Sequence, residues 1–455
     1  MFAVPKRIAN AAVALLMAAT LALQPAVAQA RSISFIRDTE IEHILRVYAT
    51  PILETAGIVP EAVTIALVND DTLNAFVAGG QNMFFHTGFL MDTGLDELIG
   101  VTAHETGHIA GGHLARMGDA MANAATIATI FTLLGLAAAI GAGRGDVGMG
   151  LMGGGQEAAM RTFFAFTRAQ EGSADEAAMK YLESLGWSSE GLLKMMQRLA
   201  GQELLPENRQ VEYVRTHPLT RNRIEAIRNF VETRSQNNGK RLPDNFHDLH
   251  ERMVAKLMGF MRPGIALRRY SATDNAIPAR YARAIALYRT GRADEAVTMT
   301  DALIAAEQDN AYFHELKGQI LFEEGRVADA VAPYREAVRL NPDSGLLRNA
   351  LGHALLEVGD DRFLEEAINH LTVAARVERS SAITWRLLSS AYSRADMPPQ
   401  LAYARAEEAL SRGDIRAAKF HADRAERMLP AGSPEWIRAQ DIRVMVESRV
   451  STSEF

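Results

Sequence analysis

The most constraining feature of the chain is the sequence His-Glu-Thr-Gly-His at residues 104–108, which lies inside an apolar run with helical spacing. Residues four apart share one face of a helix, so His104 and His108 can present two imidazoles to a single ion. Glu105 projects beside them, where a carboxylate can accept a proton from a water molecule. This arrangement is typical of zinc peptidases. The alternative is a pattern that arises by chance or from core packing, and the rest of the chain must distinguish the two.

The motif helix is expected to run from residue 95 to residue 117. His113 lies five residues after His108, which on a continuous helix rotates it off the ligand face by about 140°. We therefore give His113 a structural or outer role and do not make it a ligand.

The absence of cysteine restricts the other ligands of a metal to His, Asp or Glu, and it excludes disulfides and thiolate zinc sites. A catalytic zinc needs three protein ligands and one open position. Glu171 is the best candidate for the third ligand, because it lies on a separate predicted helix and Asp175 shares its face one turn later. Asp175 can then accept the second ring N–H of a ligand histidine. The alternative for both carboxylates is a solvated acidic helix face.

Three stretches rich in β-branched and aromatic residues precede the motif helix, and turn residues separate them, at residues 63–68, 73–78 and 83–86. We expect a small antiparallel sheet whose edge holds a peptide in extended form, as in strand addition. The candidate edge residues Asn74, Ala75 and Phe76 lie in the second stretch. The alternative is a sheet that only covers the helix.

The first 30 residues have the composition of an export signal. Lys6 and Arg7 precede an apolar stretch at residues 11–23, and small residues up to Ala30 offer a cleavage site. We expect residues 1–30 to be a cleaved signal peptide, with an uncleaved anchor helix as the alternative. A net charge of -7 and the lack of a basic block argue against a nucleic-acid partner.

Residues 120–143 form an uncharged run that is long enough to span a membrane. A downstream metal ligand requires the chain to return to the same compartment, and residues 147–156 are too short to cross again as a helix. We therefore expect residues 120–160 to form an apolar lid or a segment that contacts the membrane peripherally. A spanning helix is the alternative.

A repeat organises the C-terminal part of the chain. A 34-residue interval recurs in two series of glycines, Gly291, Gly325 and Gly359, and Gly318 and Gly352. Small residues at this period, placed where helices cross, are the pattern of tetratricopeptide repeats. We expect a repeat solenoid over residues 273–450, after a helical linker at residues 241–272. A generic helical solenoid is the alternative.

Taken together, these features resemble the zinc peptidases related to CAAX prenyl endopeptidase and HtpX. The resemblance rests on H-E-x-x-H, on the downstream E-x-x-x-D, and on an upstream N-A-F…G-G element that includes Gly79 and Gly80. It implies a mainly α fold, in which a gluzincin-type metallopeptidase domain with a small β-sheet occupies residues 31–240. A tetratricopeptide α-solenoid follows this domain.

The resemblance also implies roles for individual residues. The ligands of one Zn²⁺ per chain would be His104, His108 and Glu171. Glu105 would act as general base and then as general acid in peptide hydrolysis. His217, in Thr-His-Pro, would approach the zinc as an inhibitory fourth ligand, and Arg223 would help to shape the site. For His217 the alternative is an ordinary loop histidine.

The expected function is that of an exported, periplasmic zinc endopeptidase that degrades misfolded or misassembled envelope proteins. By resemblance, its partners are unfolded or misassembled outer-membrane proteins and the β-barrel assembly machinery, and it has chaperone-like activity in their assembly. One alternative is a repeat-based chaperone or scaffold with minor or latent proteolysis. Another is a purely structural zinc site, against which Glu105 and the cysteine-free ligand set argue.

Overall fold

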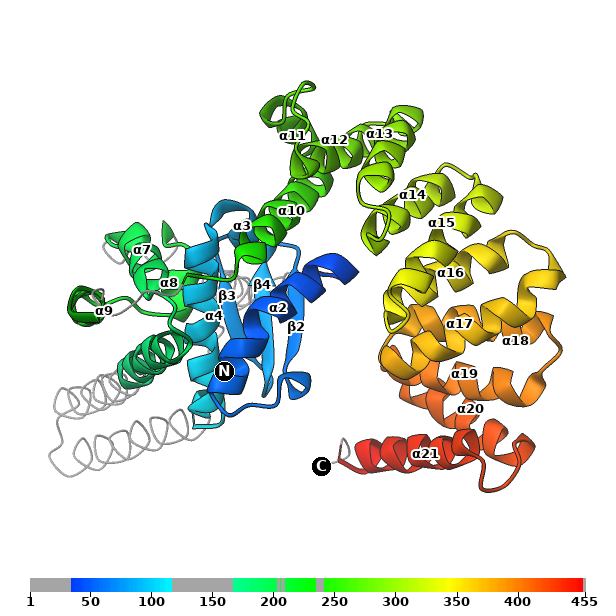
Figure 1. Cartoon of the computed structure of the whole chain (residues 1–455). Coiled ribbons are helices and arrows are strands. Elements are labelled where there is room, and N and C mark those ends of the chain that lie inside the picture. The colour runs from blue at the N-terminus through cyan, green and yellow to red at the C-terminus, as the bar shows by residue number, and fades with distance from the viewer. Residues whose placement is uncertain (1–33, 117–166, 203–204, 206–208, 235–240, 453–455) are drawn as a thin grey trace, which may run out of the picture. The chain divides into compact units, whose positions relative to one another are not determined.

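The computed structural model describes residues 34–116, 167–202, 205, 209–234 and 241–452 (Figure 1). The expected signal peptide, residues 1–30, and most of the expected lid, residues 120–160, lie outside these ranges, so both remain predictions. Within the described ranges, none of the helices combines the length and apolar character needed to cross a membrane.

The first domain is built around a small sheet in the strand order β1-β2-β4-β3. Its strands are β1 (Phe35–Ile36), β2 (Thr64–Val68), β3 (Ala75–Ala78) and β4 (Asn82–His86). β3 and β4 form an antiparallel hairpin through Gly79 and Gly80, whose φ angles of 58° and 97° suit glycine. β2 and β4 run parallel, so the prediction of an antiparallel sheet is wrong for this pair. Strand patterning did not reveal this, because either direction of pairing buries the same alternate side chains.

Helices α2 (Thr39–Thr55) and α4 (Leu95–Ala110) pack against the sheet and against each other (Figure 1). Asp38 caps α2, because its side chain accepts a hydrogen bond of 2.9 Å from the backbone N–H of Ile41. The described part of the domain also contains the helix of residues 167–185 and helices α3 (Thr87–Asp92), α7 (Glu190–Leu199), α8 (Glu212–Thr216) and α9 (Arg221–Arg234).

The motif helix α4 is shorter than expected. It ends at Ala110, whereas the sequence predicted an end near residue 117. Gly111 and Gly112 follow, and Gly112 adopts a φ of 60°, a conformation that interrupts a helix and suits glycine. The chain therefore changes direction just before His113.

Helix α10 (Asp244–Met261) joins the first domain to the repeats. It packs against α2, α3 and α4 and also against α12 (Ile277–Arg289), while α11 (Pro263–Arg269) lies beside α12. Tyr48 on α2 donates a hydrogen bond of 2.9 Å to the backbone oxygen of Phe246, and the two rings lie 4.8 Å apart. The predicted linker region thus consists of helices that share the core of the first domain.

The remaining helices form a row of antiparallel pairs (Figure 1). They are α12 and α13 (Ala293–Ala306), α14 (Ala311–Glu323) and α15 (Val327–Leu340), α16 (Gly345–Glu357) and α17 (Leu364–Val377), α18 (Ala382–Arg394) and α19 (Pro398–Ser411), and α20 (Ile415–Met428) and α21 (Pro434–Thr452). The 34-residue interval has two physical causes. Gly291, Gly325 and Gly359 turn the chain within successive pairs at φ angles of 77–78°. Gly318 and Gly352 let the two helices of a pair approach closely, because a Cβ there would collide with Tyr334 or Leu371.

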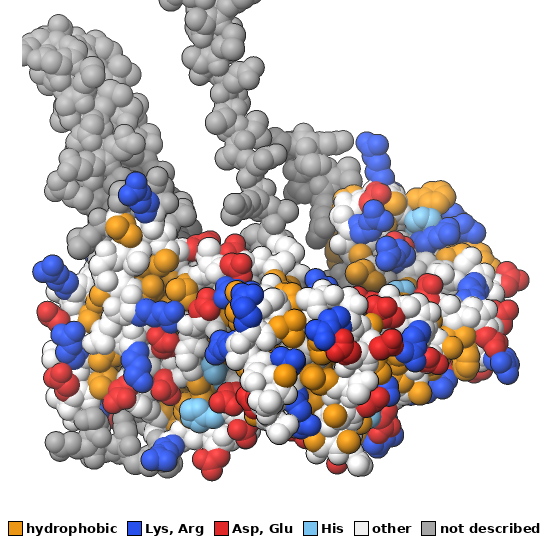
Figure 2. Space-filling view, turned by 90° about the horizontal axis from the view of Figure 1, so that it is seen from above, with side chains coloured by type: hydrophobic (Ala, Val, Ile, Leu, Met, Phe, Trp, Pro, Cys, Tyr) orange, Lys and Arg blue, Asp and Glu red, His pale blue; other side chains and the backbone are white. Residues whose placement is uncertain are grey.

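The face shown in Figure 2 carries acidic and basic side chains in alternation, with hydrophobic side chains between them singly or in small groups. This mixture is usual for a protein surface in water.

Candidate metal centre

The predicted site residues on α4 are deeply buried. His104 and Glu105 are fully shielded from solvent, and His108 retains 7% exposure. The helix starts at a well-defined point, because the Glu97 side chain accepts a hydrogen bond of 2.8 Å from the backbone N–H of Gly94. The motif side chains of this helix point into the domain.

Gly107, inside the motif, allows a second helix to reach the two histidines. A Cβ at this position would lie 2.8 Å from the backbone oxygen of Ala174, so any larger residue would separate α4 from the helix of residues 167–185. The close approach brings Glu171 and Asp175 to the histidines, although they lie more than sixty residues further along the chain.

Four side chains converge on one point. His104, His108, Glu171 and His217 each offer a ligand atom, and these atoms lie within 4.8 Å of one another. The Nε2 atoms of His104 and His108 are 3.1 Å apart. Glu171 lies between the rings, with its carboxylate oxygens 3.4 Å from His104 Nε2 and 3.3 Å from His108 Nε2. The residues predicted as metal ligands are therefore brought together.

Asp175 and Arg223 hold the ring of His104 and the carboxylate of Glu171 in place. Asp175 Oδ1 lies 2.9 Å from His104 Nδ1. Arg223 donates two hydrogen bonds of 2.6 and 2.9 Å to Asp175 and approaches Glu171 Oε2 at 3.0 Å. Such a two-pronged bond fixes direction as well as distance. The close contact of Asp175 with Nδ1 favours a proton on that atom, which leaves Nε2 of His104 to bind a metal.

His113 orients the second histidine, a specific role that the sequence did not reveal. Its Nδ1 lies 2.9 Å from Nδ1 of His108, and its Nε2 lies 3.0 Å from the Ser173 hydroxyl. This contact on Nδ1 directs Nε2 of His108 toward the centre. The available signal was the Gly111-Gly112 pair, which ends α4 and lets His113 fold back.

His217 enters the centre from the end of α8. Its Nδ1 lies 3.4 Å from Glu171 Oε1, and its Nε2 lies 3.4 Å from Glu105 Oε1. The buried ring of Tyr213 packs against it at 4.6 Å between centroids. No pattern in the sequence had indicated Tyr213.

The segment that carries His217 also covers the start of the edge strand β3. The Tyr213 N–H donates to the oxygen of Leu73 at 3.3 Å, and the Thr216 hydroxyl donates to Asn74 Oδ1 at 3.3 Å. His217 Nε2 lies 3.3 Å from the oxygen of Ala75. The predicted edge residues Asn74 and Ala75 thus contact α8, whereas Phe76 stacks on Phe84 with a centroid distance of 5.0 Å.

The electrostatics of the cluster favour positive charge at its centre. Burial disfavours a charged imidazole, but Asp175 and Glu171 outweigh it and raise the pKa of His104 to about 10. Burial lowers the pKa of His108 to about 3, so that ring stays neutral. His104 would give up the proton on Nε2 when a metal ion binds there. Burial opposes the charge of Glu171 as well, yet the neighbouring histidines lower the pKa of its carboxyl well below the usual range.

The donor set fits a metal ion. Two Nε2 atoms whose rings are held through Nδ1 face each other beside an ionised carboxylate, and a cation between them would satisfy all three. Among the described residues, neither oxygen of the buried Glu105 carboxylate meets the geometry of a hydrogen bond. Burial also raises the pKa of Glu105, with His217 and His104 opposing the shift.

Residues 36–231 match the family model of peptidase family M48, and residues 281–345 match a tetratricopeptide-repeat model. The first domain is an M48 metallopeptidase domain. In the M48 domain, the two histidines of α4 and Glu171 on the neighbouring helix occupy the positions expected of metal ligands, and Glu105 stands next to them. A row of tetratricopeptide-type helix pairs, which mediate contacts between proteins, follows the domain.

Two curated proteins named "Beta-barrel assembly-enhancing protease" are similar to this chain. The protein of Yersinia pestis is 24% identical over 390 residues, which is 82% of this chain and 76% of that protein. The protein of Escherichia coli (strain K12) is 25% identical over 356 residues, which is 75% of this chain and 69% of that protein. A solved structure titled "MamA MSR-1 C2" aligns with 36% of this chain and 97% of its own chain at 17% identity and a TM-score of 0.31, and we draw nothing from so low a score.

Proposed function

We propose that this chain is an exported zinc endopeptidase of the periplasm that acts on unfolded or misassembled outer-membrane proteins. The observation that carries the proposal is the convergence of His104, His108 and Glu171 beside the unbonded carboxylate of Glu105. The names of the similar proteins support a role in β-barrel assembly. The signal-like composition of the first 30 residues supports export.

Zinc suits the ligands better than other common metals. Two imidazoles and one carboxylate form the ligand set of many catalytic zinc sites, and hard cations such as Mg²⁺ prefer oxygen alone. His104, His108 and Glu171 would hold the ion. When bound there, zinc would lower the pKa of a water molecule and polarise the carbonyl of the peptide bond.

Glu105 carries the proton in the proposed reaction. Its carboxylate takes a proton from the attacking water and later gives it to the departing amine nitrogen. The buried, unbonded oxygens and the raised pKa of Glu105 suit both tasks. Asp175, Arg223 and His113 keep the two ligand imidazoles in orientation while the proton moves.

His217 acts in the proposal as an inhibitory fourth ligand. Its ring lies among the metal-ligand atoms, and the segment that carries it covers Leu73–Ala75 at the edge of the sheet. Release of this segment would open the metal centre and free an edge to which an extended substrate can add. His217→Ala should therefore raise the rate of cleavage of unfolded proteins. Equal rates for the variant and the wild type on several unfolded substrates would argue against this role.

The test of the proposed function combines metal analysis with proteolysis. We expect the purified full chain to contain one zinc ion, to degrade unfolded casein, to lose that activity with a chelator and to regain it with added zinc. If the wild type and His217→Ala both lacked bound metal and cleavage, the enzyme assignment would be wrong.

A second candidate function is that of a chaperone or scaffold with latent proteolysis. The observation that favours it is the closed site, in which the buried His217 stands against Glu105 and Glu171. Cells that carry only Glu105→Gln separate the two functions. Normal assembly of the outer membrane in these cells would favour the scaffold, and defective assembly would favour the peptidase.

A further inference from the structure

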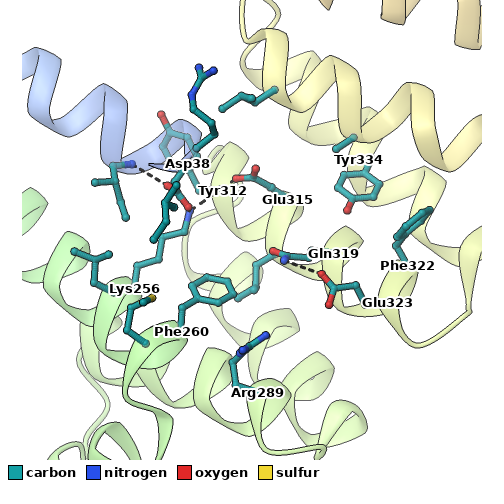
Figure 3. Close-up of a pocket in the computed structure, with 18 of the residues that line it drawn as sticks. Asp38, Lys256, Phe260, Arg289, Tyr312, Glu315, Gln319, Phe322, Glu323 and Tyr334 are labelled. Carbon is teal, nitrogen blue, oxygen red and sulfur yellow. Dashed lines mark hydrogen bonds and ion pairs between the residues drawn. The ribbon is translucent and has the colours of Figure 1, made fainter. Parts of the chain in front are cut away.

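A second cavity lies outside the metal centre, with a volume of about 550 Å³. Its walls come from the start of α2, from α10 and from the repeat helices α12 and α14–α16 (Figure 3). The volume falls within the usual range of ligand pockets, roughly 300–1,000 Å³. The proposed peptidase mechanism uses none of the residues that line it.

One end of the cavity holds more buried acidic groups than basic ones. The ammonium of Lys256 lies 2.8 Å from Asp38 Oδ2, 3.3 Å from Glu40 Oε2 and 3.9 Å from Glu315 Oε2. Figure 3 shows Lys256 of α10, Glu315 of α14 and Asp38, the cap of α2, pointing toward one another. One ammonium therefore faces three carboxylates.

The nearby arginines are engaged with other carboxylates. Arg37 binds Glu42 and Glu378, each at 2.7 Å. Arg252 lies 4.0 Å from Glu40 but donates two bonds of 2.9 Å to Glu307. The excess negative charge around Lys256 is thus only partly balanced by these side chains.

A further cation, Arg289, lines another part of the cavity together with Glu323 (Figure 3). Glu323 bonds to Tyr288 and Gln319, and the three carboxylates around Lys256 lie in a different part of the cavity.

Glu315 is the group best placed to receive a cation. Its Oε2 is buried and accepts no hydrogen bond among the described residues, while its side chain keeps 20% exposure. Burial raises the pKa of Glu315 to about 7, with Lys256 opposing the shift and Asp38 and Glu40 adding to it. A carboxyl with so raised a pKa lacks full compensation for its charge, and a bound cation would supply it.

The walls beside Glu315 are aromatic. Tyr312, Phe322 and Tyr334 line the cavity, and Tyr312 stands next to the charged end in Figure 3. Aromatic faces attract cations and also pack against methylene groups. A lysine side chain combines an ammonium with an apolar stem and so matches both features.

We propose that this cavity binds a lysine side chain of an unfolded polypeptide, with the ammonium at Glu315 and the stem against Tyr312 and Tyr334. This inference rests on the proposed function, because it names the feature by which the repeats select a client. The client is held beside the M48 domain, whose helix α2 supplies part of the cavity wall together with the joining helix α10.

The test measures binding of fluorescent 12-residue unstructured peptides to the zinc-loaded full chain carrying Glu105→Gln, which prevents cleavage. Three peptides differ only at a central residue, which is lysine, N-acetyl-lysine or glutamine. We expect the lysine peptide to bind at least tenfold more tightly than the other two. Adding Glu315→Gln should reduce this preference to less than twofold. Adding Glu324→Gln, an exposed carboxylate at the end of the same helix and outside the cavity, should leave it intact.

Two results would overturn the inference: absence of a lysine preference, or a preference that Glu315→Gln and Glu324→Gln affect equally. If Glu315→Gln does not fold, a photoreactive group next to the lysine locates the bound peptide. Crosslinks to α10 or α14 would support the inference, and crosslinks confined to other helices would contradict it.

Casein cleavage by the wild type is measured separately. Cleavage without a lysine preference refutes this inference alone, whereas a metal-loaded protein that is inactive even with His217→Ala refutes the proposed function.

Discussion

Two buried groups of charged side chains in this protein differ in what their members surround. In the metal centre, His104, His108 and Glu171 direct electron pairs toward one another. In the cluster around Lys256, three carboxylates surround an ammonium that the chain itself provides. The first group needs a cation from solution, and the second carries its own.

The difference indicates which group serves chemistry and which serves structure. A buried polar atom without a partner costs roughly 1–3 kcal/mol, so a folded protein retains one mainly where a ligand or a reaction uses it. Glu105 has two such atoms beside the metal ligands. Lys256 instead links α10 to α2 and α14. Two oxygens of its cluster, Glu40 Oε1 and Glu315 Oε2, lack a hydrogen bond among the described residues, and Glu315 is the residue of the two that lines the cavity.

The largest expected effect concerns Glu105. Glu105→Gln should lower the rate of casein cleavage about 10²–10⁴-fold, because a positioned general base contributes a factor of that order. The zinc content should stay at one ion per chain, since Glu105 is not a ligand. A rate within tenfold of wild type would mean that the unbonded carboxylate does not serve the reaction, and the contrast between the two clusters would fail.

The second prediction removes the ammonium from the other cluster. Lys256→Met should lower the free energy of unfolding by about 3–5 kcal/mol, because it leaves buried carboxylates without their counter-charge. Urea denaturation of the full chain measures this loss, and Lys194→Met, on the exposed surface of α7, is the control. Adding Glu315→Gln to Lys256→Met should recover part of the loss. A small loss, similar to that of the control, would show that the cluster is not a structural link.

The third prediction separates the two helices of the metal centre. Gly107→Ala places a methyl group 2.8 Å from the oxygen of Ala174 and should cost about 1–3 kcal/mol of stability, together with zinc affinity. Gly172→Ala is the matched control, because its Cβ would meet no atom within 4 Å. It should be neutral or stabilise by up to about 1 kcal/mol. Equal zinc affinity in both variants would exclude a role for the close approach in placing Glu171.

The smallest expected effect depends on pH. Burial raises the pKa of Glu315 from 4.5 to about 7. Between these two pH values, the carboxyl of Glu315 is protonated in the folded state and ionised in the unfolded state. The stability of the wild type relative to Glu315→Gln should therefore be greatest below pH 4.5 and fall as the pH rises to 7. A decrease of more than about 1 kcal/mol, the value of one pKa unit, is expected from urea titrations of both proteins. If the difference in stability between the wild type and Glu315→Gln does not change with pH, the charge of Glu315 is already compensated within the fold.

Much of the metal centre could be predicted from the sequence because it depends on local spacing. Four residues return a helix to the same face, so His104 and His108 had to lie together once α4 formed. The same rule placed Asp175 one turn after Glu171. The repeat was equally readable, since each glycine of the 34-residue series is required by a turn with positive φ or by a close helix contact.

Contacts between distant segments could not be read in this way. The sequence did not show that β2 and β4 run parallel, or that Gly112 ends α4 so that His113 reaches His108. It proposed His217 and Arg223 only by resemblance, and their positions depend on how α8 and α9 pack.

Local geometry thus determined the chemistry that this chain offers: two histidines and a carboxylate on one helix, two carboxylates on another, and a helical repeat. Tertiary structure alone decided which groups meet. Asp38 caps α2, Lys256 lies on α10 and Glu315 lies on α14, and no spacing rule connects residues so far apart in sequence. Their convergence follows from the packing of α2, α10 and α14. A buried charge loses its contact with water, so the fold has to place an opposite charge beside it.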